Sequence, residues 1–389
     1  MVKWMTIEEI SSNVFAGGTP STKHEEYYDG DIPWIRSGEI DFNVITSAER
    51  NITKLGYSNS SAKMIRKGSV VMAMTGATVG KTAVVEIDTS ANQSVCAIEI
   101  NESLAHYKYV YYCLAQDYYK IKASAQGALT SLNLAMIKRI VIPIPSLQEQ
   151  MRIVRILDLF TASLANSSLQ LIERRKQFEY YRNLLLDLSN KEGVEIKLLS
   201  EIASTKVGPF GSLLHKKDYI NGGVPLVNPV HMNDGKVEPD SSFSVNVDMA
   251  NKLANYRLQK DDIVFARRGE IGRCAIITEN EENFLCGTGS LIVRFKEKEK
   301  LNSKFMLYIF LSPFCRRYLE MSAIGGSMLN INCDIVGKMQ VPLPSLSEQQ
   351  RIVDILDTFE KSIVNLEAQL NERQQQYEYY REHLINLLK

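Results

Sequence analysis

The chain contains a long internal repeat, in which residues 143–188 align with residues 342–387 without a gap. The offset is constant at 199 residues, and 26 of the 46 aligned positions are identical. A repeat of this length means that one structural unit has been used twice in the chain. Any fold proposed for one half must therefore also suit the other half.

Both copies of the repeat have the pattern of a long coiled-coil helix. Ser146 and Ser345 stand three residues before Glu149 and Glu348, which is the spacing of a capping box at a helix start. Downstream, mostly hydrophobic positions recur at alternating steps of four and three, the heptad spacing of paired helices. We predict two helices of about 40 residues, each roughly 60 Å long. The heptad positions are Ile153, Leu157, Phe160, Leu164, Ser167, Leu171, Arg174, Phe178, Tyr181, Leu185 and Leu188 in the first copy, and Ile352, Leu356, Phe359, Ile363, Leu366, Leu370, Arg373, Tyr377, Tyr380, Leu384 and Leu387 in the second.

Each helix carries an arginine at the same heptad position, Arg174 in one and Arg373 in the other. A polar residue in the seam between two helices lowers stability but fixes their register. Alternatively, both side chains extend to water from a slightly rotated face. The sequence leaves these two readings open.

The segments before the helices repeat more loosely and predict two related lobes. Residues 3–10 resemble 195–202, and residues 72–81 correspond to 265–273, with an offset that drifts from 192 to 199 along the chain. Short β-rich runs predict strands, and amphipathic stretches near 104–122 and 303–319 predict one short helix each. Each lobe should therefore contain both strands and helices. We predict an α+β fold in which two α/β lobes are separated by two long antiparallel coiled-coil helices, with a pseudo-two-fold internal repeat. The predicted boundaries are 1–145 for lobe one, 146–190 for the first helix, 191–344 for lobe two and 345–389 for the second helix.

Composition narrows the class of protein only a little. The 45 basic and 45 acidic residues cancel, so any basic surface for nucleic acid must be local. Six cysteines without a C-x-x-C pair predict reduced thiols, and five histidines without ligand-like spacing predict no metal site. The absence of an 18-residue apolar run and of a signal-peptide pattern at residues 1–10 predicts a cytoplasmic protein without a membrane partner.

Known catalytic motifs are not found. Residues 75–82 end like a phosphate-binding loop, but Thr75 stands where that motif requires its first glycine. The sequence has no adenine-methyltransferase signature of the form N-P-P-Y, N-P-P-F or D-P-P-Y, and no G-x-G-x-x-G segment. The isolated E-x-K at residues 195–197 has no nuclease residues around it. We therefore predict no catalytic residue, no metal and no cofactor bound by this chain.

Glycine-rich and polar turns at equivalent places in the two lobes are candidates for DNA contact. Their backbone N–H groups and hydroxyls suit phosphates, although a plain structural turn has the same composition. Arginines in such turns can bind phosphates or the O6 and N7 atoms of guanine, unless they form surface ion pairs instead. The candidates are Gly18, Thr19, Ser21, Arg36, Ser37, Thr75, Thr78 and Lys81 in lobe one, and Gly208, Phe210, Ser212, Asn228, Arg267, Arg268 and Arg273 in lobe two.

The tyrosine-rich run at residues 107–119 has two interpretations. Exposed tyrosines can stack on nucleic-acid bases. Helical spacing and the apolar counterpart at residues 305–310 favour packing in the core instead.

The whole chain resembles the specificity (S) subunit of Type I restriction–modification enzymes. The resemblance is carried by the two P-x-P-S-L-x-E-Q-x-x-I-V-x-x-L-D-x-F segments that begin at Pro143 and Pro342. The glycine-rich segments 17–22 and 208–212 and the Ile-Pro-Trp segment 32–34 add to it. It implies that each lobe is a target recognition domain and that the helices are antiparallel spacers. The neutral net charge is a slight departure from a DNA-binding protein.

The resemblance also implies partners. It implies double-stranded DNA with an asymmetric split site, two methyltransferase subunits docked on the spacers, and two restriction subunits. S-adenosylmethionine, ATP and Mg²⁺ would belong to those subunits. The expected docking residues on the helices are Glu149, Gln150, Arg152, Tyr181, Glu348, Gln349, Arg351 and Tyr380.

Two other classes of protein remain open at this point. An S-like subunit of a Type II methyltransferase–nuclease would share every feature above. A non-enzymatic coiled-coil assembly protein would explain the helices but not the two lobes.

Overall fold

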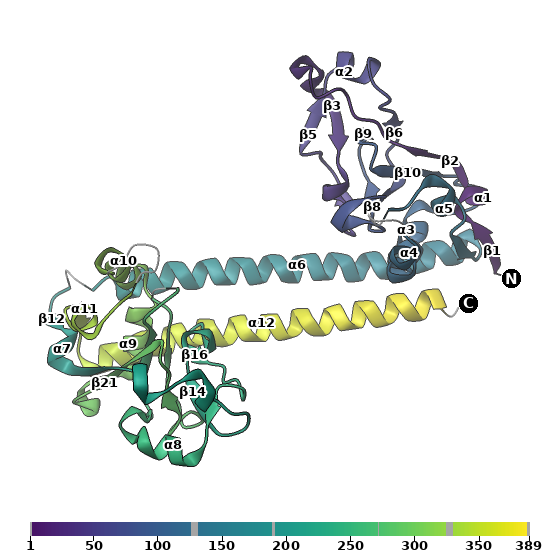
Figure 1. The fold of residues 1–389 in the computed structure, drawn as a ribbon. Helices are drawn as coiled ribbons and strands as arrows, with labels where there is room; N and C mark the ends of the chain where they lie inside the picture. Colours follow the sequence, from purple (N-terminus) through teal and green to yellow (C-terminus); the bar gives the residue numbers. More distant parts are fainter. Residues whose placement is uncertain (1, 126–130, 189–190, 271, 324–329, 387–389) are drawn as a thin grey trace. The chain divides into compact units, whose positions relative to one another are not determined.

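A computed structural model describes residues 2–125, 131–188, 191–270, 272–323 and 330–386. The chain divides into two compact units, residues 1–169 with 368–389 and residues 170–367. Helix α6 (Leu147–Leu186) and helix α12 (Leu346–Asn386) each contribute one half to each unit (Figure 1). A unit therefore consists of one lobe, one half of the helix that follows it and one half of the other long helix.

Lobe one contains two larger sheets and a short two-stranded one. Most of its strands meet in antiparallel pairs, but β3 runs parallel to β9, and β4 runs parallel to β8. The sheets are β2 (Ser11–Ala16), β10 (Val95–Ile100), β7 (Ser69–Ala73), β8 (Thr82–Val85) and β4 (Val44–Ile45); then β5 (Arg50–Ile52), β3 (Tyr28–Ile35), β9 (Thr89–Ala91) and β6 (Met64–Ile65); then β1 (Lys3–Thr6) with β11 (Val141–Ile144). The helices are α1 (Ile7–Ile10), α2 (Lys54–Ser58), α3 (Tyr107–Gln116), α4 (Tyr118–Ser124) and α5 (Leu134–Lys138).

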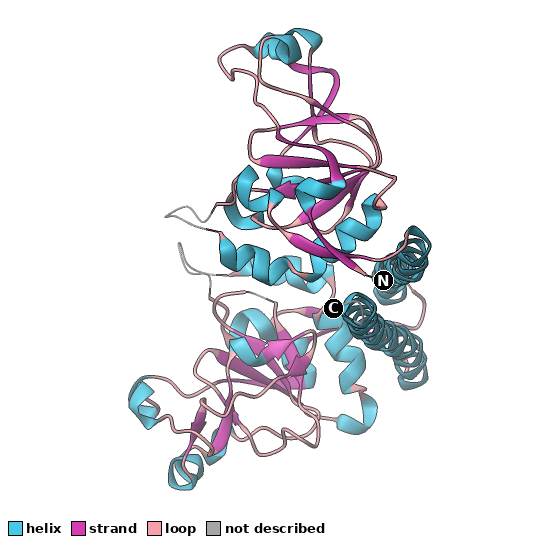
Figure 2. Ribbon diagram, turned by 90° about the vertical axis from the view of Figure 1, so that its right-hand side faces the viewer, coloured by secondary structure: helices cyan, strands magenta, loops and turns pink. Residues whose placement is uncertain are grey.

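Lobe two has a similar set of sheets, in which several strands are shorter than their counterparts. Figure 2 distinguishes strands, helices and loops by colour. Strands β14 and β20 form its parallel pair. The sheets are β13 (Ala203–Val207), β21 (Ser290–Phe295), β18 (Ile263–Ala266) and β19 (Cys274–Ile276); then β17 (Ser244–Val245), β14 (Val224–Val227) and β20 (Leu285–Cys286); then β15 (Met232–Asn233) with β16 (Lys236–Val237); then β12 (Glu195–Leu198) with β22 (Gln340–Leu343). The helices are α7 (Leu199–Ile202), α8 (Val247–Lys252), α9 (Ser303–Phe310), α10 (Pro313–Ser322) and α11 (Cys333–Gly337).

The strand orders of the lobes correspond. The order β2-β10-β7-β8 in lobe one matches β13-β21-β18-β19 in lobe two, and the parallel pair β3–β9 matches β14–β20. In each lobe the first strand pairs with the last strand before the long helix, which closes the lobe on itself. The predicted α+β fold class, with two related lobes and two long helices, is confirmed.

The middle of the tyrosine-rich run packs in the core of lobe one, whereas Tyr119 at its end is exposed. Tyr109, Tyr111 and Tyr112 on α3 are buried, and the hydroxyl of Tyr109 donates to the carbonyl of Pro143 at 2.6 Å. The single helix expected near 104–122 is in fact two, because α3 ends at Gln116 and α4 begins at Tyr118. Lobe two has the same break, where Ser312 caps the start of α10.

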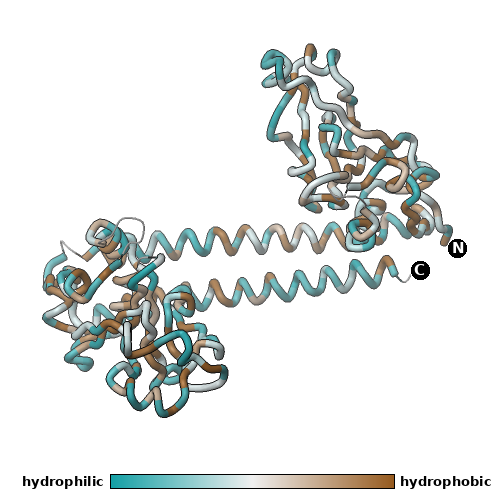
Figure 3. Tube along the Cα trace, in the orientation of Figure 1, coloured by the Kyte–Doolittle hydropathy of each residue, from teal (hydrophilic) through white to brown (hydrophobic). Residues whose placement is uncertain are grey.

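The long helices pair antiparallel within each unit. In the first unit the ring of Phe160 stacks on that of Tyr380 at 5.1 Å, and in the second unit Tyr181 stacks on Phe359 at 5.3 Å. Figure 3 shows hydrophobic residues recurring between hydrophilic ones along both helices, as heptad spacing requires. The heptad residue Leu387, and residues 189–190 and 387–389 at the predicted helix ends, lie outside the described residues.

The two seam arginines make contacts across the helix pair, which favours a place in the seam over extension to water. Arg373 donates to the hydroxyl oxygens of Ser163 at 2.5 Å and Ser167 at 3.0 Å. Arg174 lies over the ring of Phe359 at 5.9 Å. The partners differ because the repeat places Leu366 where the first copy has Ser167.

Candidate nucleic-acid interface

The parallel strands of lobe one bring several predicted DNA-contact residues to one edge. Strands β3 and β9 run side by side, and the N–H of Asn92 donates to the carbonyl of Ile35 at 3.0 Å. Because parallel strands end at the same edge of a sheet, the residues that follow them meet there. Arg36 and Ser37 follow β3, and Asn92 follows β9. We call the lobe-one polar edge the set Thr19, Arg36, Ser37, Thr75, Thr78, Lys81, Asn92 and Gln93.

The glycine-rich turn of lobe one joins the same edge. The N–H of Gly17 donates to Val95 at 3.0 Å, and that of Gly18 donates to Ala91 at 2.8 Å. A Cβ on Gly17 would lie 2.2 Å from the carbonyl oxygen of Ala91, so only glycine fits. These N–H groups are engaged within the lobe, which supports the structural interpretation of the glycines. The Thr19 side chain pairs with Gln93 at the surface.

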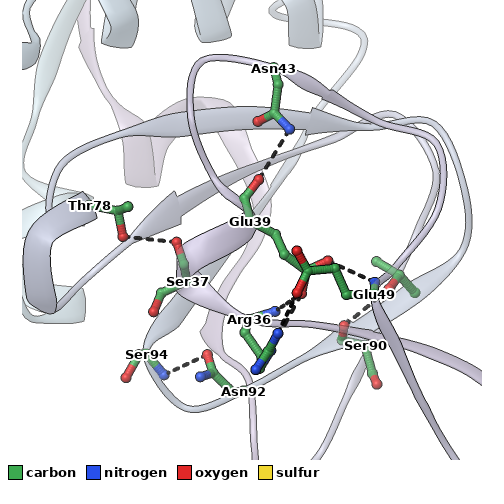
Figure 4. Close-up of polar contacts among 10 residues, drawn as sticks. Arg36, Ser37, Glu39, Asn43, Glu49, Thr78, Ser90, Asn92 and Ser94 are labelled. Atoms are coloured by element: carbon green, nitrogen blue, oxygen red, sulfur yellow. Dashed lines mark hydrogen bonds and ion pairs between the residues drawn. The ribbon is translucent and has the colours of Figure 1, made fainter. Parts of the chain in front are cut away.

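A third turn reaches the edge from β7. The hydroxyl of Thr78 donates to the carbonyl of Ser37 at 2.8 Å and ties this turn to the one after β3 (Figure 4). Thr75 starts the turn and is partly exposed. The structure thus brings together three segments that the sequence identified separately. Ser21 is exposed in the loop beyond them and caps the backbone of Lys23.

Acidic side chains neutralise the basic residues of this edge. Figure 4 shows Arg36 held between Glu39 and Glu49, with which it forms ion pairs. The Glu39 carboxylate also accepts the backbone N–H groups of Arg36 at 2.8 Å and Glu49 at 3.0 Å, which fixes the loop. Lys81 pairs with Asp41 at 2.6 Å. Two cations therefore face three carboxylates here.

Lobe two has an equivalent edge built by the same backbone bonds. The N–H of Gly287 donates to the carbonyl of Val227 at 2.9 Å, as Asn92 does to Ile35 in lobe one. Gly208 donates to Ser290 at 2.9 Å, and a Cβ there would lie 1.9 Å from the Gly287 carbonyl oxygen. Asn228 therefore occupies the place of Arg36. We call the lobe-two polar edge the set Asn228, Arg267, Arg268, Arg273, Gly287 and Thr288.

The three arginines of this edge have different surroundings. Arg267 is partly buried and donates to the carbonyl of Ile331 at 3.3 Å and the side chain of Asn330 at 3.4 Å. Burial lowers its pKa from the ordinary value, and the charge of Arg268 lowers this pKa further. Arg273 donates to the carbonyl of Pro229 at 3.3 Å and pairs with Glu270. Arg268 is exposed.

Two other candidates of lobe two lie outside this set of contacts. Phe210 and Ser212 are exposed in a short 3-10 turn after β13. Their exposure permits contact with a ligand, but within the described ranges no hydrogen bond joins either side chain to the arginines. They stay predictions.

Sequence reasoning missed part of each edge. Asn92 and Gln93 in lobe one, Gly287 and Thr288 in lobe two, and Asn330 were not singled out. A usable signal was present, because Asn92 and Gln93 directly follow the buried strand β9. The supporting carboxylates of Glu39 and Glu49 carried no sequence pattern.

The docking residues predicted on the long helices fall into two groups. Glu149 pairs with Arg152 through two bonds of 2.8 and 2.6 Å, and Glu348 with Arg351 through two of 2.7 Å. Each pairing lowers the pKa of the carboxyl below its ordinary value. The capping box is thus half formed, since the serine accepts the N–H of each glutamate while the carboxylate turns to the arginine. The arginines of these pairs are exposed and the glutamates partly exposed, and Tyr181 and Tyr380 are exposed as well.

Gln150 and Gln349 are unlike the other docking candidates, because they are 0% and 2% exposed. Gln150 donates to the carbonyl of Pro145 at 2.9 Å and accepts the N–H of His106 at 2.8 Å. Gln349 donates to Pro344 at 2.9 Å and accepts the N–H of Asn302 at 2.9 Å. Their amides join helix to lobe, so we correct their assignment from partner contact to internal support.

Within the described ranges, no group of three or more His, Cys, Asp or Glu side chains is placed to hold a metal ion. The same part of the chain includes no helix that is long and apolar enough to cross a membrane. Burial raises the pKa of the Cys96 thiol to about 12, which disfavours the reactive thiolate form.

Two related lobes with equivalent polar edges, each joined to a long helix, define a class of internally repeated two-lobed protein. The family described as Type I restriction modification DNA specificity domain matches residues 1–174 and 191–374. The chain belongs to this family. Its members supply DNA sequence recognition in restriction–modification systems and are non-catalytic, with the activities carried by partner subunits.

Individual relatives agree with the family assignment. A Type I restriction enzyme specificity subunit of Escherichia coli is 31% identical over 204 residues, which is 50% of each chain. One from Methanocaldococcus jannaschii is 24% identical over 386 residues, covering 92% of this chain and 86% of the relative. The crystal structure of a Type I S subunit from M. genitalium aligns over 99% of this chain and 96% of that one, with a TM-score of 0.60 at 17% identity. This last likeness confirms the fold.

Proposed function

We propose that the chain recognises an asymmetric, bipartite DNA site, with one half-site bound by each lobe. The proposal rests on one observation: the two polar edges share their backbone frame but not their side chains. Asn228 replaces Arg36, and Gly287 replaces Asn92, at positions fixed by the same hydrogen bonds. In the major groove each base pair presents its own pattern of hydrogen-bond donors and acceptors. Different side chains at equivalent backbone positions therefore select different bases.

Under this proposal the two polar edges contact DNA, and the backbone hydrogen bonds behind each edge keep its side chains in place. Phosphate contacts position such a protein, while side chains at base edges supply specificity. The proposed DNA contacts are Gly18, Thr19, Ser21, Arg36, Ser37, Thr75, Thr78 and Lys81 in lobe one, with Asn92 and Gln93 added, and Gly208, Phe210, Ser212, Asn228, Arg267, Arg268 and Arg273 in lobe two, with Thr288 added.

The helices would carry the partners. Each unit has one surface Glu–Arg pair and one stacked aromatic pair, and this repetition suits two copies of one methyltransferase subunit. The remaining docking residues are Glu149, Arg152, Tyr181, Glu348, Arg351 and Tyr380. Adenine methylation would require base flipping and S-adenosylmethionine in the methyltransferase, and cleavage would require ATP and Mg²⁺ in restriction subunits. The complex would act in the cytoplasm.

Expression with the methyltransferase subunit that acts with it tests the proposal. In a host without other such systems, methylome sequencing should show adenine methylation at one split, asymmetric site. The chain expressed alone should produce no methylation and bind no S-adenosylmethionine. Methyl transfer by the pure chain, or a continuous or palindromic target, would contradict the proposal. ATP-dependent cleavage with a separate restriction subunit distinguishes a Type I complex from a Type II one.

A further inference from the structure

The backbone of Arg267 and Arg268 is fixed from two sides. Arg267 donates its N–H to the carbonyl of Gly289 at 2.8 Å and accepts the N–H of Ile331 at 3.1 Å. Arg268 forms an isolated antiparallel bridge with Asn330. These bonds hold the segment directly after β18 in extended form. The side chains at this point therefore project from a rigid part of lobe two.

Successive side chains of an extended segment point to opposite sides. Arg267 turns inward, where its guanidinium meets Ile331 and Asn330. Arg268 consequently turns outward and is exposed. Within the described part of the chain, no hydrogen bond or ion pair engages the Arg268 guanidinium. The nearby carboxylate of Glu270 is already paired with Arg273.

The two polar edges differ in charge. At the lobe-two edge the three cations Arg267, Arg268 and Arg273 accompany one carboxylate, Glu270. At the lobe-one edge two cations accompany three carboxylates. Thr75 stands in the place of Arg268, because the residues before them make equivalent backbone bonds: Met74 bonds to Ser94 and Leu132, and Arg267 bonds to Gly289 and Ile331. Among the described residues, therefore, only lobe two has a guanidinium without a partner at this backbone position.

We propose that Arg268 is the side chain of lobe two that recognises a guanine. The inference rests on the proposed function and assigns roles among its three arginines. A guanidinium has two parallel N–H donors that match the O6 and N7 acceptors of guanine in the major groove. Arg267 and Arg273 have these donors engaged within the lobe. Arg268 is exposed and held on a fixed backbone, and its donors have no partner among the residues that the structure describes.

Selection from a pool of randomised DNA duplexes by the full chain tests this proposal. The wild-type chain should enrich a split motif with a guanine in one block. Arg268→Ala should abolish the preference at that position, a loss of about 5- to 150-fold, which corresponds to about 1–3 kcal/mol. Arg268→Gln should shift the preference there to adenine, since glutamine pairs with adenine N6 and N7. All other positions of both blocks should stay unchanged.

The matched control is Lys260→Ala, which removes one positive charge at the opposite end of β18 and should leave the motif intact. Weaker binding of all duplexes alike by Arg268→Ala would identify a phosphate contact and overturn the proposal. An unchanged motif would overturn it too, while leaving the proposed function standing. A wild-type chain that enriches no motif would contradict both proposals.

Discussion

His231 shows how a single buried side chain supports the polar edge of lobe two. It is 3% exposed, and its Nδ1 atom accepts the backbone N–H of Asn228 at 3.1 Å. Its Nε2 atom makes no hydrogen bond with any residue that the structure describes. Burial lowers the pKa of this imidazole below its ordinary value. The ring is therefore neutral near pH 7. Its Nδ1 atom can then accept the N–H of Asn228 and hold that residue in place.

Lowering the pH should destabilise lobe two through His231. Because its pKa is lower in the folded chain, the unfolded chain binds the proton first, from about pH 6.5 downward. The stability that neutral His231 contributes is present above that pH and is lost as the pH falls below it. We expect the free energy of unfolding to fall by up to about 1.4 kcal/mol per pH unit for this one proton. Urea unfolding at a series of pH values between 7.5 and 5 measures this dependence of the free energy of unfolding on pH.

The control for this experiment is His231→Gln. The glutamine amide can accept the Asn228 N–H but does not titrate, so the variant should have a shallower pH dependence. His106 also has a pKa lowered by burial, but it contributes equally to both proteins. Identical slopes for the wild type and the variant would show that His231 does not titrate in this range.

At the residue level the sequence located the polar edges but could not separate their members. It identified Arg267, Arg268 and Arg273 as one cluster, because their spacing says nothing about burial. Their roles depend on Asn330 and Ile331, which lie more than 60 residues away in the chain. Likewise, the neutralising contact of Arg36 with Glu49 arises from loop geometry that no local pattern encodes.

At the scale of elements, the junction between each long helix and its lobe is a buried glutamine. Gln150 satisfies three backbone groups in two segments, since it bonds to Leu104 and His106 before α3 and to Pro145 before α6. Gln349 makes the corresponding bonds in lobe two to Asn302 and Pro344. A buried amide with its bonds satisfied in this way fixes where the helix leaves the lobe.

Gln150→Ala should lower the free energy of unfolding by about 1–3 kcal/mol, because it leaves buried backbone groups without partners. Hydrogen exchange at the His106 amide should accelerate, since that N–H loses its acceptor. The matched control is Gln148→Ala, an exposed residue of the same helix, which should change stability by less than about 0.5 kcal/mol. Loss of partner binding with unchanged stability and exchange would instead restore Gln150 to the docking surface.

The long helices were predictable because their periodicity is local and sustained over many turns. Helices α6 and α12 begin at Leu147 and Leu346, directly after Ser146 and Ser345. The shorter elements were less predictable. The break between α3 and α4 leaves the amphipathic pattern intact, and the parallel pairing of β3 with β9 joins segments more than 50 residues apart.

At the scale of the whole molecule, the repeat makes each helix a possible partner for a copy of itself. Phe160 stacks on Tyr380, which is the counterpart of Tyr181 in the second copy. Tyr181 in turn stacks on Phe359, the counterpart of Phe160. Two copies of α6 paired antiparallel would therefore reproduce both aromatic pairs. The contacts of Arg373 with Ser163 and Ser167 would be reproduced by Arg174.

A chain that ends after residue 190, with lobe one and α6 only, should form a homodimer. With the methyltransferase subunit this dimer should methylate an inverted repeat of the first half-site, because both lobes are then identical. From the sequence, Ser167 in place of leucine should weaken the dimer modestly. The structure adds an opposing contribution, since Ser167 is an acceptor for a seam arginine. Light scattering and methylome sequencing measure the two outcomes.

Arg174→Ala in the truncated chain tests which contact holds the dimer. Removing that guanidinium leaves Ser163 and Ser167 of the paired copy without their donor, so the dimer should dissociate at higher protein concentration than the unsubstituted truncation. Lys176→Ala changes an exposed charge two residues further along the same helix and should leave dissociation unaltered. A soluble truncated chain that remains monomeric, or that still directs methylation to the original asymmetric site, would contradict the two-fold pairing. Loss of the dimer in both variants would mean that net helix charge, rather than the seam contact, controls the pairing.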